Sequence, residues 1–288
     1  MKNNQIDPSS SIHPDVVLGT FNKIGKNVVI DIIGNSTVGR VSLGDNNIIN
    51  DNTRIIVSGH LNIGDWNVFH NNMLVLADDF IKVGHNCWFG QNTILDGAGG
   101  LEIGNGVRVG MYSQIWTHVA SGEQIEGCTF FSKRKTVIND DVWLVGSCYV
   151  SSGLNLGKRT TVLINSVVTK DTLENKCYAG NPAKLLDKVQ VYQPKTLEQK
   201  FSMIENWLKD FVSLNNDTYK IETLIDDIII YNIEKNEKVI FTKSEKQITD
   251  NSTSVFSLFY KTFNKTNLFT EREVYKYLYN NKARFIPK

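Results

Sequence analysis

The chain has 288 residues, of which 41% are hydrophobic, so it can build a sizeable core in one long domain with room for a smaller second one. Lys and Arg total 31, whereas Asp and Glu total 30, which leaves a formal net charge of +1. This balance argues against nucleic acid or an acidic membrane surface as the main partner.

Four cysteines, Cys87, Cys128, Cys148 and Cys177, are scattered along the chain and form no Cys-x-x-Cys pair. Their spacing argues against a zinc ribbon or a thioredoxin-like site, and scattered thiols fit a reducing compartment. The N-terminus carries no apolar signal-peptide stretch, and apolar runs such as the one at 228–230 are too short to span a membrane. We therefore expect a cytoplasmic protein without a membrane span.

The next feature along the chain is an internal repeat. Aliphatic-Gly dipeptides recur at intervals of 20 residues, at Leu43-Gly44, Ile63-Gly64, Val83-Gly84 and Ile103-Gly104. Inside each unit the apolar positions step by six, and two extra residues complete the unit. The longest run of six-residue steps is Ile138, Leu144, Val150, Leu156, Val162 and Val168.

This pattern predicts a three-sided coil in which each side is a short strand with one aliphatic residue pointing inward. Stacked coils bury a continuous apolar column, and each strand gains hydrogen bonds from the coils on either side. Gly, Asn and Asp after the aliphatic residue suit tight corners, where a positive φ is often needed. A β-sandwich would instead show strict alternation of apolar and polar residues. The handedness of the coil does not follow from the spacing.

The last coils resemble the hexapeptide-repeat acyltransferases, and most closely those that O-acetylate sugars and polysaccharides. The resemblance covers about residues 14–190. It departs from the family pattern at Asn139, Val145, Asn155 and Leu163, and it implies an all-β fold built as a left-handed parallel β-helix solenoid. The segments that carry it are Ile138-Asn-Asp-Asp-Val-Trp-Leu-Val-Gly-Ser147, Val150-Ser-Ser-Gly-Leu-Asn-Leu-Gly157, Val167-Val-Thr-Lys-Asp171 and Ala179-Gly-Asn-Pro-Ala-Lys184.

Three segments follow from these patterns. Residues 1–190 are expected to form the β-helix catalytic domain, 195–215 a helix packed on its end, and 216–288 a small α+β extension. The helix is predicted from a capping box at Thr196-Leu-Glu-Gln199 and from apolar residues at helical spacing after it. In the extension, strands at 228–233 and 238–242 suggest a hairpin, and Thr270 is expected to cap a second helix. Its aromatic residues either bind a glycan or close a small core, and we favour the core for Phe256, Phe259, Tyr260, Tyr275 and Tyr279.

The six-residue register breaks once, in a long loop between Ile115 and Ile138 that opens with Trp116-Thr117-His118. Long loops on rigid scaffolds are where functional residues concentrate. His118 resembles the catalytic histidine that the family carries at the head of this loop, although Val119 stands where the family often has proline. An imidazole suits removal of a hydroxyl proton near neutral pH.

The resemblance implies an enzyme that moves an acetyl group from acetyl-CoA to a hydroxyl of a sugar. The acceptor would belong to a bacterial surface polysaccharide, such as capsule or lipopolysaccharide, or to its precursor. His118 would be the general base, and Trp116 and Asn92 would contact the acceptor. Asn92 could equally be one more corner residue.

CoA is expected to lie in a groove between neighbouring subunits of a homotrimer. Acetyl-CoA is then a co-substrate, and the resemblance gives no reason to expect a metal. Lys133 and Arg134 belong to a basic cluster that could meet the CoA phosphates, although a charge run is more often a solvated face. The positions that match family residues beside CoA are Trp143, Gly146, Ser147, Thr169, Lys170, Gly180 and Asn181.

Three alternatives stay open at this point. The acceptor could be the amino group of an amino-sugar nucleotide, which would make the protein an N-acetyltransferase. A γ-type carbonic anhydrase uses the same fold but needs three histidines around a metal, and no histidine stands five residues after His85. The third alternative is a scaffold protein without catalytic activity, which would be distinguished from an acetyltransferase because it would release no CoA thiol from acetyl-CoA.

Overall fold

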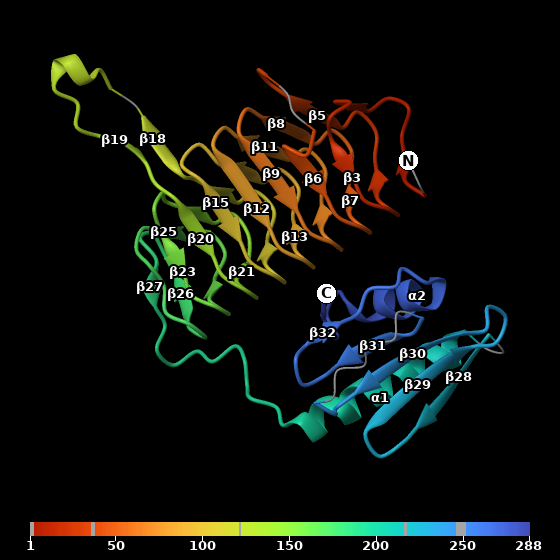
Figure 1. Cartoon of the computed structure of the whole chain (residues 1–288). Helices are drawn as coiled ribbons and strands as arrows, with labels where there is room; N and C mark the ends of the chain where they lie inside the picture. Colours follow the sequence, from red (N-terminus) through yellow and green to blue (C-terminus); the bar gives the residue numbers. More distant parts are fainter. Residues whose placement is uncertain (1–2, 36–37, 121, 216–217, 246–251) are drawn as a thin grey trace. The chain divides into compact units, whose positions relative to one another are not determined.

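The computed structural model describes residues 3–35, 38–120, 122–215, 218–245 and 252–288. The chain divides into two compact units, which we call the coil unit (Met1–Tyr192) and the C-terminal unit (Gln193–Lys288). The boundary lies close to the one expected at residue 190, and Figure 1 shows the elements of both units.

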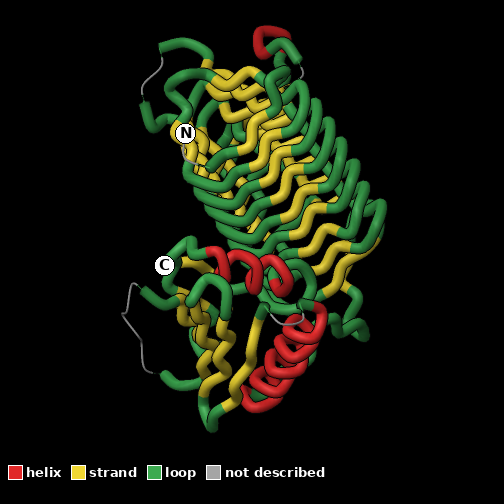
Figure 2. The backbone as a smooth tube through the Cα atoms, turned by 90° about the vertical axis from the view of Figure 1, so that its right-hand side faces the viewer, coloured by secondary structure: helices red, strands yellow, loops and turns green. Residues whose placement is uncertain are grey.

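The coil unit consists of three sheets, and successive strands of the chain enter them in rotation, so that each turn adds one strand to each sheet. Figure 2 shows these turns stacked on one another. The pairing is parallel throughout except between β26 and β27. Sheet 1 contains β1 (Gln5–Ile6), β4 (Lys23–Ile24), β7 (Ile48–Ile49), β10 (Val68–Phe69), β13 (Trp88–Phe89), β16 (Arg108–Val109), β21 (Trp143–Leu144), β24 (Thr161–Val162), β26 (Cys177–Ala179) and β27 (Lys184–Leu185). Sheet 2 contains β2 (Ser11–Ile12), β5 (Val29–Ile32), β8 (Arg54–Val57), β11 (Leu74–Ala77), β14 (Ile94–Asp96), β17 (Gln114–Ile115), β22 (Tyr149–Val150) and β25 (Val167–Val168). Sheet 3 contains β3 (Val17–Leu18), β6 (Val41–Leu43), β9 (His60–Ile63), β12 (Phe80–Val83), β15 (Leu101–Ile103), β20 (Thr136–Ile138) and β23 (Asn155–Leu156).

The predicted inward residues form the core of this unit. The strands of the three sheets from β4 to β26 contribute buried aliphatic or aromatic side chains to a column between the sheets, and the residues at six-residue steps from Ile63 to Val168 are all buried. In the first coil Ile6, Ile12 and Leu18 are only partly buried. Burying one such side chain is worth about 1.5–3 kcal/mol, so the repeat itself supplies most of the driving force for coiling. Inward aliphatic residues occur on every side, as expected, but the longer strands bury two of them and not one, for example Ile55 and Val57 in β8.

The corners use two kinds of residue for two different reasons. The glycine of each aliphatic-Gly dipeptide is needed because a Cβ on Gly64 or Gly84 would lie within 3 Å of the backbone of the next coil. The positive φ falls two residues later, for example at Asn46 and Asn86. The positive φ expected at these corners is therefore present, but at the asparagine, while the glycine is required for close packing.

The long loop after Ile115 forms a projecting two-stranded arm, which we define as His118–Lys133. It contains β18 (His118–Ala120), a 3-10 turn (Gln124–Glu126) and β19 (Phe131–Lys133), and the two strands pair antiparallel. Figure 1 shows the arm leaving the coils beside β15 and β20. Its residues lie outside the three stacked sheets, so this is the one place where the described coils open into a separate hairpin.

The C-terminal unit is a six-stranded sheet with two helices. The predicted capping box at Thr196 is present, and the predicted hairpin is formed by β29 and β30. The second helix begins at Phe269 with Leu268 as its N-cap, so the expected cap at Thr270 is wrong by two residues. The elements are α1 (Leu197–Leu214), β28 (Tyr219–Thr223), β29 (Asp227–Asn232), β30 (Glu237–Thr242), β31 (Ser254–Ser257), β32 (Thr262–Phe263), α2 (Phe269–Leu278) and β33 (Ile286–Pro287).

The contacts of α1 are with its own unit. Its buried side chains lie on one face, and Phe211 packs against Tyr219 and Tyr277, so the helix meets β28 and α2. The helix was expected to pack on the end of the coils as a separate segment, whereas its buried face belongs to the core of the C-terminal unit.

The aromatic residues of the C-terminal unit divide into two groups. Phe256, Tyr275 and Tyr279 are buried, as the core prediction requires, whereas Phe259 and Tyr260 are exposed and contact each other. Tyr275 fixes the C-terminal strand, because its hydroxyl bonds both the carbonyl and the N–H of Phe285. Within the described residues, neither helix combines the length and apolar character needed to cross a membrane.

Candidate functional site

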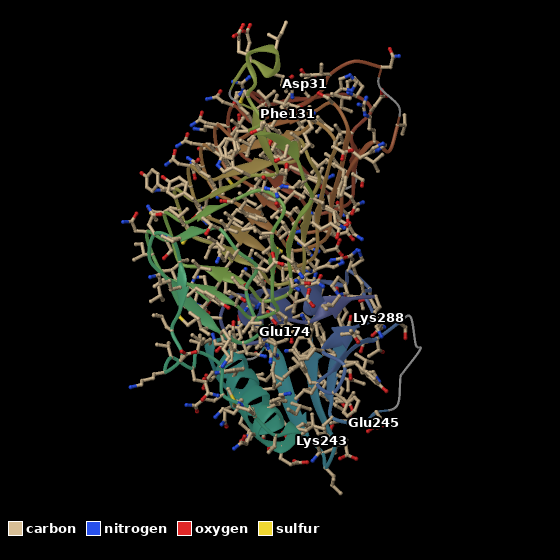
Figure 3. All side chains as sticks on the ribbon, turned by 90° about the vertical axis from the view of Figure 1, so that its left-hand side faces the viewer. Asp31, Phe131, Glu174, Lys243, Glu245 and Lys288 are labelled. Carbon is tan, nitrogen blue, oxygen red and sulfur yellow. The ribbon has the colours of Figure 1, made fainter. Side chains whose placement is uncertain are left out.

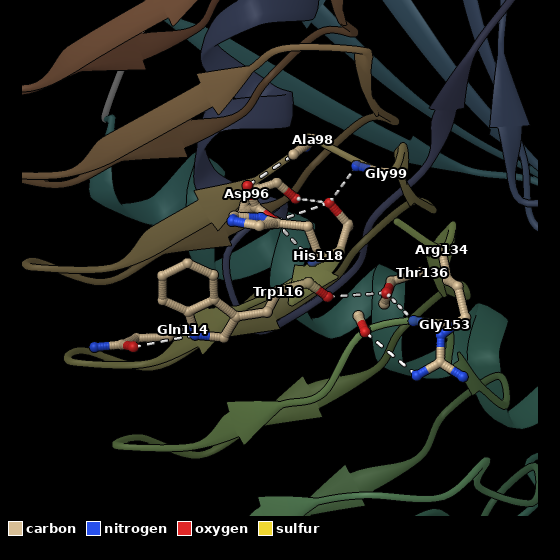
Figure 4. Close-up of polar contacts among 11 residues, drawn as sticks. Asp96, Ala98, Gly99, Gln114, Trp116, His118, Arg134, Thr136 and Gly153 are labelled. Carbon is tan, nitrogen blue, oxygen red and sulfur yellow. Dashed lines mark hydrogen bonds and ion pairs between the residues drawn. The ribbon is translucent and has the colours of Figure 1, made fainter. Parts of the chain in front are cut away.

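A buried carboxylate lies beside the histidine at the base of the arm. Oδ2 of Asp96 is 2.9 Å from Nδ1 of His118 (Figure 4). The Asp96 side chain is 1% exposed, whereas that of His118 is 34% exposed. Because a carboxylate only accepts hydrogen bonds, we assign the proton to Nδ1. The other ring nitrogen, Nε2, is then the one that can accept a proton.

Asp96 is held by the residue before the histidine. The N–H of Thr117 donates to Oδ2 of Asp96 at 2.7 Å, and the Thr117 hydroxyl lies 2.8 Å from the same oxygen. The N–H of Gly99 donates to that hydroxyl at 2.8 Å. Oδ2 therefore accepts from Thr117 and His118 together, which satisfies a carboxylate that would be costly to bury alone.

The sequence Asp96-Gly-Ala-Gly-Gly100 explains how the carboxylate reaches this position. The segment ends β14 and makes the corner to β15, where the chain passes close to the base of the arm. A Cβ on Gly99 would overlap the carbonyl oxygen of Thr117 and the backbone nitrogen of Arg134. Glycine is required here so that the corner can approach both ends of the arm.

Trp116 forms one wall of this site. Its ring lies 5.9 Å from the His118 ring in an edge-to-face arrangement, and its Nε1–H donates to Gln114 at 3.2 Å. Its carbonyl accepts from the hydroxyl of buried Thr136 at 3.0 Å, which ties it to the following coil (Figure 4). The structure thus brings the rings of Trp116 and His118 together, and a role of Trp116 in binding the acceptor stays a prediction.

Thr169 stands in the same column as Trp116. Ile115, Val150 and Val168 are successive partners in sheet 2, so the residues after them, Trp116, Ser151 and Thr169, lie above one another at the corner between sheets 2 and 3. Neighbouring strands are about 4.8 Å apart, which places Thr169 about 10 Å from Trp116 along the coils. Thr169 and the adjacent Lys170 are exposed there.

A second group of predicted residues occupies the opposite corner, between sheets 1 and 2. Asn92 and Ser147 are corner residues with φ of 57° and 47°, and the N–H of Ser147 donates to Met111 at 2.8 Å. Asn92 lies in the corner before β14, which begins at Ile94, whereas Asp96 is the last residue of that strand. The structure therefore supports a corner role for Asn92 and does not bring it to His118 within one chain. The N–H of Ser147 is likewise engaged inside the coil.

Gly146 differs from the corner glycines. A Cβ added there meets nothing closer than the Met111 carbonyl oxygen at 3.6 Å, and its φ is not positive. The hydrogen bonds of Ser147 to Met111 and of Tyr112 to Gln91 align Gly146 with Met111 in the preceding coil. The fold therefore accepts a side chain at this position and does not itself require glycine.

The remaining predicted cofactor residues lie on the outside of the last coils. Trp143 is exposed in sheet 1, on a different side from His118. Gly180 and Asn181 are exposed after β26, and the N–H of Gly180 donates to Ser166 at 3.0 Å. Gly180 also accepts from the N–H of Val167 at 3.0 Å, which places it at the same corner as Ser147.

The basic residues 133–135 at the end of the arm have different surroundings. Lys133 lies opposite His118 in the antiparallel ladder. The backbone N–H of Arg134 donates to Thr117, while its guanidinium reaches toward Ser152 at 3.5 Å (Figure 4). Lys135 is ion-paired with Glu102 at 3.2 Å on sheet 3. Three consecutive cations thus face three different parts of the surface.

The thiols offer no nucleophile at this site. Cys87, Cys148 and Cys177 are buried, and burial raises the pKa of the Cys148 and Cys177 thiols, which disfavours the reactive thiolate. Cys128 lies in the arm beyond β18. In the described parts of the chain, no three His, Cys, Asp or Glu side chains converge as a metal site would require.

Asp96 was not identified from the sequence. It stands in β14 in register with Leu76 of β11, a position that is apolar in that coil, and three of the four residues after it are glycines. The same register position is Ile56 in β8 and Asp31 in β5, so a carboxylate there does not by itself mark a site. The glycine-rich corner that follows Asp96 is the sequence feature that sets it apart from Asp31.

No protein-family model matches the chain. The Saccharomyces cerevisiae protein named "Putative acetyltransferase YJL218W" is 40% identical over 52 residues, which are 18% of this chain and 26% of that protein. The chain thus spans about a quarter of the length of this curated relative.

Solved structures similar to the chain include hexapeptide-repeat acetyltransferases, the family suggested by the sequence. The polysialic acid O-acetyltransferase OatWY is 18% identical with a TM-score of 0.45, over 68% of this chain and 92% of that one. The polySia specific acetyltransferase NeuO is 16% identical with a TM-score of 0.44, over 67% and 83%. The hexapeptide-repeat containing acetyltransferase VCA0836 from Vibrio cholerae is 26% identical with a TM-score of 0.36, over 39% and 64%.

Proposed function

We propose that this protein is a left-handed parallel β-helix O-acetyltransferase that moves the acetyl group of acetyl-CoA to a hydroxyl of a sugar in a bacterial surface polysaccharide or its precursor. The observation that carries the proposal is the pair formed by buried Asp96 and partly exposed His118. A carboxylate on Nδ1 fixes the tautomer in which Nε2 is the base, and it stabilises the imidazolium that forms during the reaction.

The proposed reaction transfers the acetyl group directly. Nε2 of His118 takes the proton of the acceptor hydroxyl while the hydroxyl oxygen attacks the carbonyl carbon of the thioester. The C–S bond of the tetrahedral intermediate then breaks, and the imidazolium returns the proton to the departing sulfur. The products are the acetyl ester and the CoA thiol, and His118 is neutral again. General-base catalysis of this kind contributes about 10²–10⁴-fold in rate.

We place acetyl-CoA against Gly146, Ser147, Thr169, Lys170, Gly180 and Asn181. Gly146 supports this placement, because a glycine that the fold does not need is consistent with close approach of a ligand to the backbone. Ser147 would contribute its hydroxyl or carbonyl, since its N–H bonds Met111. Arg134, whose guanidinium lies near Ser152, faces the same later coils and suits a phosphate. Trp143 would line the outer part of the groove.

We also propose that each complete site needs two copies of the chain. The His118 and Gly146 corners lie on opposite edges of sheet 2, so one chain does not bring them together. A closed ring of three copies could place the Gly146 corner of one copy against the His118 corner of the next. The outer face of sheet 2 carries partly buried Ile56, Leu74, Leu76 and Ile94, which suits an interface between subunits.

The proposal is tested by incubating the purified protein with acetyl-CoA and a panel of acceptors. The panel contains bacterial polysaccharides, their oligosaccharides and amino-sugar nucleotides, and mass spectrometry follows both the acetylated product and free CoA. We expect acetyl ester on a sugar hydroxyl. Acetyl amide on an amino-sugar nucleotide would instead establish N-acetyl transfer, and an absence of CoA release with every acceptor would contradict an acetyltransferase.

A further inference from the structure

The arm places a lysine next to the proposed base. The register of β18 and β19 pairs His118 with Lys133 and Ala120 with Phe131. Residues directly opposite each other in an antiparallel pair project to the same face, with Cβ atoms about 4.5–5.5 Å apart. The ammonium group of Lys133 therefore rises from the same face of the arm as the His118 imidazole.

Lys133 is distinguished from the two cations that follow it. Lys135 is paired with Glu102 at 3.2 Å, and the guanidinium of Arg134 is directed to Ser152. Across the described ranges of the chain, no carboxylate forms an ion pair with Lys133, whose side chain is exposed. An exposed charge is usually only a solvated group. Here, however, it stands across one ladder rung from the residue that would take the acceptor's proton.

An aromatic side chain completes this face of the arm. Phe131 lies two residues before Lys133, so both project to the same side of the strand, and its side chain is 53% exposed. Figure 3 labels Phe131 on the arm. Trp116 stands on the other side of the His118 ring, 5.9 Å away. Imidazole, ammonium and exposed aromatic ring thus occupy neighbouring positions.

This combination matches the chemistry of an acidic sugar. The apolar face of a sugar ring can lie against Phe131, while a hydroxyl of the same chain reaches Nε2 of His118. A carboxylate or phosphate on the chain would then meet the Lys133 ammonium in a charge-assisted hydrogen bond. A neutral acceptor would leave the lysine without this partner.

We infer that Lys133 is a specificity residue that selects acceptor chains carrying a carboxylate or a phosphate. The inference rests on the proposed function and deepens it by naming the acceptor class. It assigns Lys133 to the acceptor and leaves Arg134, on the side of the later coils, to acetyl-CoA. The alternative source of an anion at Lys133 is a phosphate of CoA itself, and the test separates the two.

Binding is measured by calorimetry with matched pairs of probes. A hyaluronan octasaccharide is compared with its carboxyl-reduced form, and galactose 1-phosphate with galactose. We expect wild type to bind at least one anionic probe about fivefold to tenfold more tightly than its neutral partner, as a partly exposed charge-assisted hydrogen bond allows. Lys133→Gln should abolish this preference, Lys133→Arg should keep it, and Lys135→Gln is the matched control that should also keep it.

Two results would overturn the inference. One is equal binding, or no binding, of each anionic probe and its neutral partner by wild type. The other is a preference that survives in Lys133→Gln. The affinity for CoA should be unchanged in Lys133→Gln, and a loss there with an intact sugar preference would assign the lysine to CoA. Failure of the proposed function is distinguishable, because it appears as absent acetyl transfer by wild type, whereas equal transfer to acidic and neutral acceptors removes only the inference.

Discussion

Asp96 and His118 are 22 residues apart in the sequence, yet the Asp96 carboxylate lies 2.9 Å from Nδ1 of the His118 ring. Three features produce this contact: the 20-residue coil that stacks β17 on β14, the glycine-rich corner after Asp96, and the bonds from Thr117 to the same carboxylate. The preceding coil, through Asp96, thus orients the His118 ring, although His118 is itself the first residue of the exposed arm.

Replacing Asp96 with asparagine should reduce turnover while leaving the fold in place. The amide has nearly the same size but no charge to stabilise an imidazolium, and its single oxygen cannot accept at both carboxylate positions. We expect kcat to fall by about 10–10³-fold with little change in the KM for acetyl-CoA. Asp45→Asn, at a distant corner where the side chain accepts from Thr20, is the control. Equal losses of kcat in the two variants would contradict a role for Asp96 through His118.

Replacing Gly99 with alanine should disturb the base of the arm. The added Cβ would overlap backbone atoms of Thr117 and Arg134, so the strand ends that position His118 must shift. We expect a loss of about 1–3 kcal/mol in the free energy of unfolding, measured by urea denaturation, together with at least tenfold slower transfer. A variant with wild-type stability and wild-type rate would show that the corner does not need this close approach.

Replacing Gly146 should weaken the binding of acetyl-CoA without destabilising the fold. Because no atom lies closer than 3.6 Å to an added Cβ, the free energy of unfolding of Gly146→Ala should stay within about 0.5 kcal/mol of the wild-type value. Its KM for acetyl-CoA should rise about tenfold or more if the thioester arm passes over this backbone. Gly110→Ala is the structural contrast, since its Cβ would overlap the Val145 carbonyl. An unchanged KM for acetyl-CoA would remove Gly146 from the site.

Mixing two inactive variants tests whether sites are shared between copies. His118→Ala and Gly146→Leu each damage one corner, so refolding them together at equal amounts should rebuild about one site in four if the corners come from different chains. The measured rate should then recover to about a quarter of wild type. Sites built within one chain would stay inactive in the mixture.

The burial of His70 should lower the free energy of unfolding in mild acid. Burial lowers the pKa of His70, so the folded protein favours the neutral ring, which stacks edge-on against Trp88. As the pH falls below about 6.5, the unfolded chain takes up the proton first, and the free energy of unfolding decreases until the folded ring also titrates. Above that pH the contribution is fully present.

Denaturation of wild type and His70→Gln at about pH 7.5 and about pH 5.5 measures this effect. The decrease on acidification should be smaller in His70→Gln, while His60→Gln, at an exposed position, should behave as wild type. Parallel decreases in wild type and His70→Gln would show that other groups govern the acid response.

The coils were predictable because their signal is spread over many equivalent positions. Each aliphatic residue from Ile63 to Val168 repeats the same inward role, so a single substitution such as Asn139 for glycine does not hide the period. The C-terminal hairpin followed for a similar reason, from two apolar runs around a polar turn. The start of α2 did not, because its first turn is organised by Glu271, which accepts from Thr266 and Ser254 and replaces an N-cap side chain.

The site was less predictable because its members are defined by neighbours across coils. His118 was found from its place at the head of the only long break in the register, and Trp116 came with it. Asp96 could not be distinguished from other corner acids without knowing that Thr117 and His118 lie above it. Asn92 was instead a candidate that the structure explains without a ligand, because its positive φ of 57° is a backbone conformation that asparagine tolerates. Whether Gly146 and His118 meet depends on a second copy, which one sequence does not describe.

The most direct test of the account is the rate of acetyl transfer from acetyl-CoA by wild type and His118→Ala, measured in one assay with an acceptor that wild type modifies. Circular dichroism and the thermal midpoint establish that both proteins have the same fold. We predict that His118→Ala transfers acetyl about 10²–10⁴-fold more slowly at unchanged affinity for CoA. Equal rates for the two proteins would contradict the assignment of His118 as the base.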